Sequence, residues 1–484
     1  MESCYYYTIS LGFEQGRFEL VADGAPDRPK LLCMYIIYNL LTAVGMLLLL
    51  PYFFVRGLLR GESFGHARER LGWSFPPELQ NGQRSIPREG AIWLHAVSVG
   101  EVQAALPLAS RLRERFPQRP LVISTTTTTG QKLAHERLPS ADAFLYFPLD
   151  WKGPVTRALK AVHPAAVVIM ETEIWPNFLR QSRRAGIPVI FVNGRLSEKS
   201  FRGFRRGVSL SGGVLQGFLT RILKDATLFL MQSEKDAERL LQLGAEPKRV
   251  IVTGNLKYDL GASAPTPLSD WLGRAIARYE RAPVVVAGSV LLGEAEAVLR
   301  AFASVECSFP RALLVLAPRK PDHFDAVARI VAASRRTSIR RSAITLSEDC
   351  QATLSEPGSV FLLDSVGELA GLYRLADTVF VGGSLVPGGG HNLLEPAAYR
   401  KPPVYGPFME NFQEISAIFL EEGAAIQVTN AEELGAAWLQ LLSDRGRSAQ
   451  KGAAAYALVE QNRGATARVL VHIEQIVTQA RSVV

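Results

Sequence analysis

The sequence has few cysteines and lacks several short motifs that identify common enzyme classes. Four cysteines occur in 484 residues, and none forms a Cys-x-x-Cys pair. Scattered thiols of this kind do not suggest a disulfide scaffold or a zinc site, and they are typical of a reduced, cytoplasmic setting. The chain has no Gly-x-x-x-x-Gly-Lys-[Ser/Thr], Gly-x-Ser-x-Gly or His-Glu-x-x-His motif. A P-loop hydrolase, an α/β-hydrolase and a zinc protease are therefore not expected.

The sequence also has no Asp-x-Asp pair that could hold a divalent cation against a diphosphate, and only seven histidines. We therefore expect no metal and no other cofactor. If the protein transfers a group from a phosphorylated donor, arginine, lysine and backbone N–H groups must neutralise the leaving phosphate.

Basic residues exceed acidic ones, 54 to 46, which gives a formal net charge of +8 and a pI of about 9.3. This balance favours anionic partners such as phosphates or an acidic membrane surface. Nucleic acid is not an expected partner, because the chain has no zinc-finger spacing, no RNP-type aromatic pair and no long basic run.

Residues 31–55 form the only long apolar run, and it contains no charged residue. Its length is enough to cross a bilayer, and it is too long for a cleaved signal peptide. Four arginines lie between residues 56 and 70, so the positive-inside rule places the large C-terminal part in the cytoplasm. Asn39 and Pro51 leave a tilted or partly embedded helix as an alternative. Residues 1–30 have no clear periodicity and are left unassigned.

Beyond the apolar run, short β-branched segments alternate with helical patterns, which is typical of doubly wound parallel sheets. The expected strands are 91–97, 120–125, 143–147, 165–170, 188–192, 227–231 and 249–252, then 283–287, 312–317, 359–363, 378–381, 403–405 and 424–428. We therefore predict an α/β protein with two Rossmann-like domains. Their bounds are 56–260 for the N-terminal domain, 261–267 for a linker, 268–450 for the C-terminal domain and 451–484 for a C-terminal helix.

Residues directly after the predicted strands matter most, because open α/β sheets bind ligands beyond the carboxyl ends of their strands. In the first domain these residues include the carboxylates Glu101 and Glu171 and the amine Lys257. In the second domain they include arginine and glycine. This distribution suggests a hydroxyl acceptor on one side and a phosphorylated donor on the other.

The segment 378–397 combines a β-branched run, a glycine-rich loop and a helix start that carries Asn392 and Glu395. Backbone N–H groups of such a loop can hold an anion at a helix N-terminus. A tight turn before a capped helix fits the same residues equally well.

Six ordered motifs resemble those of the Kdo transferases, which transfer 3-deoxy-D-manno-oct-2-ulosonic acid (Kdo) to the lipid A precursor. The motifs are Trp93 to Glu101, Met170 to Asn177, Asn193 to Ser197, Gly254 to Asp259, Asp364 to Leu369 and Gly382 to Glu395. The resemblance runs from about residue 34 to the C-terminus. It implies a GT-B glycosyltransferase with an N-terminal membrane-anchor helix, on the cytoplasmic face of the bacterial inner membrane. It also implies CMP-Kdo as donor, inversion at the sugar and the tetraacylated lipid A precursor (lipid IVA) as acceptor.

The resemblance further implies the catalytic roles. Glu101 matches the general base that would deprotonate the glucosamine hydroxyl of the acceptor. Taken by itself, a carboxylate in a first helical turn more commonly stabilises the helix dipole. Glu171 and Lys257 match positions that stabilise the transition state, and a lysine beside a departing phosphate has a clear electrostatic purpose.

The CMP-Kdo site is expected at the strand ends of the second domain. A carboxylate such as Glu395 can accept hydrogen bonds from both ribose hydroxyls, and Arg319 can bind a phosphate or a sugar carboxylate through two N–H groups. The full set of expected donor-binding residues is Ser289, Pro318, Arg319, Val366, Gly367, Glu368, Leu369, Gly382, Gly383, Ser384, Asn392, Leu393, Leu394 and Glu395.

The sequence departs from the family pattern at several donor-side positions. Lys320 replaces a histidine, Leu393 replaces a proline, and the segment after Ser289 lacks the usual threonine. Two other functions stay open: a GT-B nucleotide-sugar epimerase, which needs no lipid acceptor, and an inactive, membrane-tethered binding protein. The basic stretch 195–224 favours a membrane-facing transferase, although such a stretch is more often a solvated helix face.

Overall fold

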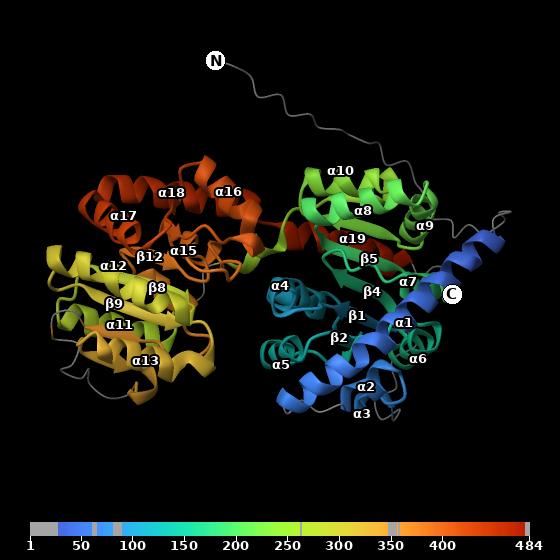
Figure 1. The fold of residues 1–484 in the computed structure, drawn as a ribbon, viewed down its shortest axis with the longest axis horizontal. Helices are drawn as coiled ribbons and strands as arrows, with labels where there is room; N and C mark the ends of the chain where they lie inside the picture. Colours follow the sequence, from blue (N-terminus) through green and yellow to red (C-terminus); the bar gives the residue numbers. More distant parts are fainter. Residues whose placement is uncertain are drawn as a thin grey trace, which may run out of the picture. The chain divides into compact units, whose positions relative to one another are not determined.

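The computed structural model describes residues 28–60, 65–80, 90–261, 264–346, 356 and 359–479. The chain forms two compact units, one that ends before Gly65 and one that comprises Gly65–Val484. Figure 1 shows the ribbon coloured along the sequence. Most of the unassigned segment 1–30 lies outside the described residues.

The described part of the first unit is one helix, α1 (Arg28–Arg60), so the helix predicted at 31–55 is confirmed. Several of its large apolar side chains are exposed, among them Leu41, Leu47 and Leu48 at 67–72%. Among the residues whose side chains are described, no helix is both long and apolar enough to cross a membrane. The membrane-spanning part of the prediction stays a prediction.

The first sheet has seven strands, all paired in parallel, in the order β3-β2-β1-β4-β5-β6-β7. The strands are β1 (Ala91–His95), β2 (Leu121–Thr125), β3 (Ala143–Tyr146), β4 (Pro164–Met170), β5 (Val189–Gly194), β6 (Leu228–Met231) and β7 (Val250–Val252). The helices are α2 (Gly65–Arg70), α3 (Pro77–Gln80), α4 (Val99–Arg115), α5 (Thr128–Arg137), α6 (Lys152–Val162), α7 (Pro176–Arg184), α8 (Glu198–Leu210), α9 (Val214–Leu223) and α10 (Glu234–Gln242).

Strand side chains alternate between two buried faces, as expected for a sheet covered by helices on both sides. On one face Leu94, Val168 and Val192 form a core with α4. On the other face Trp93 packs edge-on against Phe178 of α7 at 5.4 Å between ring centroids. Burial on both faces explains why these strands are nearly continuous apolar runs.

The second sheet also has seven parallel strands, in the order β10-β11-β9-β8-β12-β13-β14. The strands are β8 (Val284–Val290), β9 (Leu313–Pro318), β10 (Ser338–Arg340), β11 (Val360–Leu362), β12 (Thr378–Val381), β13 (Pro403–Tyr405) and β14 (Ile426–Gln427). The helices in this part of the chain are α11 (Pro267–Arg278), α12 (Ala295–Ser308), α13 (Phe324–Ala333), α14 (Leu369–Leu372), α15 (Leu394–Ala397), α16 (Gln413–Glu421), α17 (Ala431–Ser443) and α18 (Arg445–Asn462), and α19 (Ala465–Gln479) follows them.

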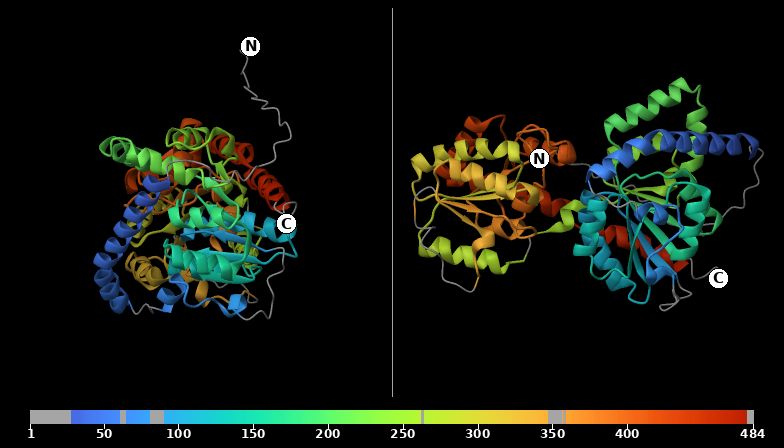
Figure 2. Two further views of the ribbon diagram at one scale, coloured as in Figure 1. Left: turned by 90° about the vertical axis from the view of Figure 1, so that its right-hand side faces the viewer. Right: turned by 60° about the horizontal axis from the view of Figure 1, so that its bottom comes forward.

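The core of this second domain is again divided by its sheet. Val286, Val315 and Phe361 pack with α11 and α18 on one face. Their neighbours along the strands pack with α12, α13 and α17 on the other face. Figure 2 shows helices on both sides of this sheet.

Every predicted strand is present within two residues at its start. The sequence analysis missed β10, a three-residue edge strand with an exposed serine. Its few apolar residues give no alternating pattern long enough to recognise.

The segment predicted as one C-terminal helix is two helices. The predicted boundary at 450 falls inside α18, which packs into the second domain through Leu458 and Val459. The last helix, α19, packs instead against the first sheet through Val469 and Ile473. Its start is held by Asp259, whose carboxylate accepts hydrogen bonds from the N–H groups of Gly464 and Thr466. The end of the chain thus completes the core of the first domain.

Candidate active site

Glu101 lies in the first turn of α4, directly after β1. Ser98 caps this helix. The Glu101 carboxylate accepts hydrogen bonds from the Val97 N–H at 2.8 Å and from the Ser98 hydroxyl at 3.0 Å. The side chain is only 7% exposed. Both interpretations of this residue therefore have a structural basis, since the carboxylate joins the cap and also lies beyond the carboxyl end of β1.

The pKa of Glu101 is raised to about 8, mainly by burial and to a smaller extent by the negative charge of Glu171. Glu173 adds a smaller upward effect on this pKa, whereas the hydrogen bonds from Val97 and Ser98 lower it. A base is most effective when its pKa lies near the working pH, because it is then partly ionised and still holds a proton well. The site thus gives Glu101 a proton affinity that suits a general base.

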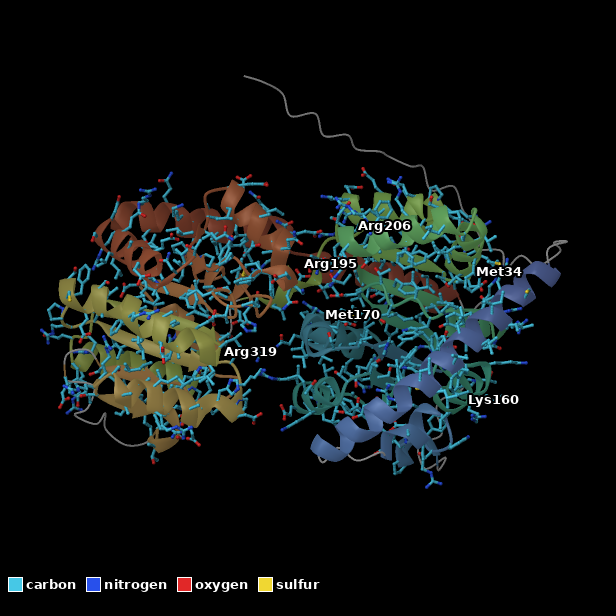
Figure 3. All side chains as sticks on the ribbon, in the orientation of Figure 1. Met34, Lys160, Met170, Arg195, Arg206 and Arg319 are labelled. Carbon is cyan, nitrogen blue, oxygen red and sulfur yellow. The ribbon has the colours of Figure 1, made fainter. Side chains whose placement is uncertain are left out.

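Glu171 directly follows β4 and has a left-handed backbone with φ of 55°. Asn193 in β5 shares this conformation, with φ of 56°. Strained non-glycine residues of this kind often occur at functional sites, where surrounding contacts hold them. Here Thr172 supplies such a contact, because its hydroxyl donates to the Arg195 carbonyl at 2.7 Å and accepts from the Arg195 N–H at 3.0 Å. In Figure 3, Met170 and Arg195 mark the carboxyl ends of these neighbouring strands.

Lys257 belongs to a short 3-10 helix, η2 (Leu256–Leu260), that follows β7. Amide side chains hold this helix: the Asn193 side chain accepts from the Leu256 N–H at 2.9 Å, and that of Asn255 accepts from the Lys257 N–H at 3.0 Å. The Lys257 ammonium lies 4.8 Å from the ring centroid of Phe412, a cation–π contact.

Burial lowers the pKa of Lys257, and the charge of Arg195 acts in the same direction. The carboxylates of Glu171 and Glu101 oppose this effect and raise the pKa. The charges of the three predicted catalytic residues thus act on one another. Their individual roles stay predictions.

The predicted donor-binding segments follow four neighbouring strands, β11, β9, β8 and β12. Ser289 near the end of β8 has a left-handed φ of 55°. Gly382 lies so close to it that a Cβ at this glycine would be 2.5 Å from the Ser289 carbonyl oxygen. Only glycine allows this approach of the two backbones.

Asn392 and Glu395 lie at the start of α15 and contact one another. The side-chain oxygen of Asn392 accepts from the Leu394 N–H at 3.0 Å, and its amide donates to the Glu395 carboxylate at 3.2 Å. The binding role expected for the two residues stays a prediction. Burial raises the pKa of Glu395, while Asn392 and the charges of Arg319 and Arg137 lower it. Glu395 is therefore a partly buried carboxylate with arginine charges nearby.

His391 lies within the motif Gly382 to Glu395, next to the predicted site residue Asn392. Its ring packs on Gly383, and its Nε2 atom is buried without a hydrogen-bond partner among the described residues. The pKa of His391 is lowered to about 4, mainly by burial and in addition by the charge of Arg319. A neutral imidazole with one free nitrogen therefore lies beside the glycine loop.

Several predicted donor residues already have protein partners. Glu368 pairs with Arg341 at 3.1 Å, and the Ser384 hydroxyl accepts from the Gly406 N–H at 2.8 Å. The N–H groups of Gly383 and Ser384 donate to the buried carboxylate of Glu294. Among the predicted donor residues, Arg319 and Val366 have exposed side chains.

Comparisons with known proteins agree with the motif resemblance. The family described as 3-deoxy-D-manno-octulosonic-acid transferase (kdotransferase) matches residues 65–260. The 3-deoxy-D-manno-octulosonic acid transferase of Haemophilus influenzae is 33% identical over 390 residues, which cover 80% of this chain and 88% of the relative. This chain belongs to the Kdo transferase family.

Solved structures are also similar to this chain. The C-terminal CMP-Kdo binding domain of WaaA from Acinetobacter baumannii is 33% identical and covers 40% of this chain and 96% of its own, with a TM-score of 0.36. A putative UDP-N-acetylglucosamine 2-epimerase from Listeria monocytogenes is 16% identical and covers 79% of this chain and 95% of its own, with a TM-score of 0.50. The second similarity concerns the fold, and it agrees with the GT-B architecture that the two parallel sheets form.

Three residues that contact predicted site residues were not expected from the sequence. Glu294, Arg341 and Phe412 contact predicted site residues from segments far away in the sequence. A buried glutamate after a strand is a weak signal, because most glutamates at helix starts are solvated caps. The free nitrogen of His391 could have been suspected from its place between a glycine loop and a helix start.

Proposed function

We propose that this glycosyltransferase moves Kdo from CMP-Kdo to a glucosamine hydroxyl of lipid IVA, with inversion and with Glu101 as general base. The observation that carries the proposal is the Glu101 carboxylate, which is buried in the first turn of the helix after β1 and has a pKa raised to about 8. Membership in the Kdo transferase family supports the transferred sugar.

In the proposed reaction, Glu101 takes the proton from the acceptor hydroxyl while the hydroxyl oxygen attacks the anomeric carbon of Kdo. The bond between that carbon and the phosphate oxygen breaks, and CMP leaves with the bonding electrons. One displacement from the opposite face inverts the configuration. A neutral hydroxyl is a weak nucleophile, and a phosphate whose charge is not neutralised is a poor leaving group. Removal of the proton and neutralisation of the phosphate must therefore act together.

Cationic side chains would neutralise the phosphate as it leaves. Lys257 is partly buried beside Phe412, where its charge is screened less than in water. Arg319 is exposed at the end of β9 and is well suited to bind a phosphate or the Kdo carboxylate. Glu395 would accept hydrogen bonds from the ribose hydroxyls, and Glu171 would orient the acceptor or Lys257.

We also propose that the protein works at the cytoplasmic face of the bacterial inner membrane, beside an anionic lipid surface. The exposed apolar side chains of α1 support this location. A second feature is the turn between α8 and α9, where Leu210 is 90% and Val214 61% exposed. The exposed Arg205 and Arg206 on α8 belong to the same basic stretch. Arginines beside exposed apolar side chains suit the interface of an anionic membrane.

The test is a transfer assay with purified protein, CMP-Kdo and lipid IVA, followed by mass spectrometry of the lipid. We expect a mass increase by whole Kdo units and release of CMP. A matched reaction without lipid tests the epimerase alternative, in which the donor sugar would change without any acceptor. An unchanged lipid together with an altered donor would refute the proposed transferase.

A further inference from the structure

The fully buried carboxylate of Glu294 contacts the glycine loop, residues 382–390, that follows β12. Glu294 ends a short 3-10 helix, η3 (Leu292–Glu294), directly before α12, and its side chain is 0% exposed. One carboxylate oxygen accepts hydrogen bonds from the N–H groups of Leu291 at 2.8 Å and Gly383 at 2.7 Å. The other accepts from those of Ser384 and Leu385, both at 2.8 Å. Four N–H donors around two oxygens match an ionised carboxylate, which can only accept.

These contacts join two loops that follow neighbouring strands of the sheet. Residue 291 follows β8, and residues 383–385 follow β12, which pairs with β8 in parallel register. The glycine loop also closes on itself, because the Gly390 N–H donates to the Gly383 carbonyl at 2.7 Å. Glu294 thus determines where this loop lies relative to Ser289.

Consecutive N–H groups that converge on one point form a nest, the kind of backbone site that usually binds a phosphate. In this protein the Gly383, Ser384 and Leu385 N–H groups are already used by Glu294. The preceding N–H group, that of Gly382, donates to the Gly288 carbonyl at 2.8 Å. The first part of the loop therefore has no N–H group left for a donor phosphate.

We propose that Glu294 is a positioning residue of the donor site: its carboxylate acts as a built-in anion that holds the glycine loop in its binding shape. The donor phosphate is then bound by groups beyond the nest, which include Arg319 and the free nitrogen of His391. This inference rests on the proposed function, because it assumes that the loop borders the CMP-Kdo site. It goes beyond that function by assigning the loop's N–H groups to the protein itself.

The first experiment measures CMP affinity by calorimetry for wild type, Glu294→Ala and Glu294→Gln. Because each variant removes charge-assisted hydrogen bonds to buried N–H groups, we expect CMP to bind about 10- to 100-fold more weakly. Glu296→Gln is the matched control. Glu296 lies two residues further on, is exposed, and should leave CMP affinity unchanged.

The second experiment separates positioning from general stability. Glu294→Ala removes a fragment the size of acetate, so added acetate should restore CMP affinity, while acetamide at the same concentration should not. Glu294→Gln fills the same volume and should not respond to acetate. If Glu294→Ala does not fold, Glu294→Gln alone decides the question through its CMP affinity.

Amide hydrogen exchange supplies a readout that does not depend on CMP. We expect residues 383–385 to exchange at least about tenfold faster in Glu294→Gln, with the strands of the second sheet unchanged. Wild-type exchange in this loop together with wild-type CMP affinity would overturn the inference and leave the proposed function intact. Failure of the wild-type protein to bind CMP would instead overturn the proposed function, and the exchange data would still decide whether Glu294 holds the loop.

Discussion

Replacing Glu101 with glutamine should abolish transfer and, at the same time, stabilise the protein at alkaline pH. The two effects have one cause, the burial that raises the pKa of Glu101 from 4.5 to about 8. Glutamine keeps the size of the side chain and one acceptor oxygen but cannot accept a proton at neutral pH. Loss of a general base typically slows a reaction by about 100- to 10,000-fold.

The sign of the stability effect follows from proton binding. Between pH 4.5 and about 8 the folded protein keeps a proton on Glu101 that the unfolded chain has lost, so stability falls as the pH rises through this window. A difference of about 3.5 pKa units corresponds to at most about 5 kcal/mol at 1.36 kcal/mol per unit. The glutamine variant lacks this pH dependence. Its free energy of unfolding should therefore increase relative to that of wild type as the pH rises.

Urea unfolding of wild type and Glu101→Gln at pH 5 and pH 9, followed by tryptophan fluorescence, measures this difference. A relative gain of 2 kcal/mol would move the midpoint by about 1 M for an m-value of about 2 kcal/mol/M. Glu136→Gln is the control, because Glu136 is exposed on α5. Identical pH dependence of wild type and Glu101→Gln would refute the reasoning about burial, and wild-type turnover would remove Glu101 from the mechanism.

Three further predictions concern pH, metal and membrane. Transfer by the wild-type protein should slow about tenfold per pH unit below pH 8, as protonation of Glu101 removes the base, and a flat rate profile between pH 6 and 8 would contradict this. Activity should survive EDTA because Lys257 and Arg319 replace a metal ion at the phosphate, so a loss restored by Mg²⁺ or Mn²⁺ would be evidence against it. A truncated protein that starts at Arg60 should keep its affinity for CMP but use lipid IVA in liposomes less well, and with more inhibition by salt, than the full chain. Equal salt sensitivity of the two proteins on liposomes, with detergent-dispersed acceptor as the control, would mean that α1 is not the main tether.

The architecture of the two sheets could be predicted because their strands are buried on both faces. The apolar, β-branched composition of runs such as Val284 to Ala287 and Ala166 to Met170 is enough to predict a strand. The alternation of these strands with helices then predicts parallel pairing. The positions of Glu101, Glu171 and Arg319 followed from the same pattern, since Glu171 and Arg319 come directly after β4 and β9 and Glu101 lies in the first turn of the helix after β1. For these features the relevant information lies within about ten residues of the chain.

The tertiary structure determined how deeply those residues are buried, which charges lie near them and which neighbours hold them in place. The raised pKa of Glu101 depends on burial and on Glu171, seventy positions further along the chain. The N–H groups of the glycine loop predict a phosphate site when read alone, yet Glu294 reaches them from about ninety residues earlier. Likewise α19 packs against the first sheet, although its own apolar pattern does not indicate which sheet it contacts. The periodicity of an element indicates how much apolar surface it must bury. The element that covers this surface is determined only when distant segments pack together. The same is true of the charged group that accepts a hydrogen bond from a buried N–H donor.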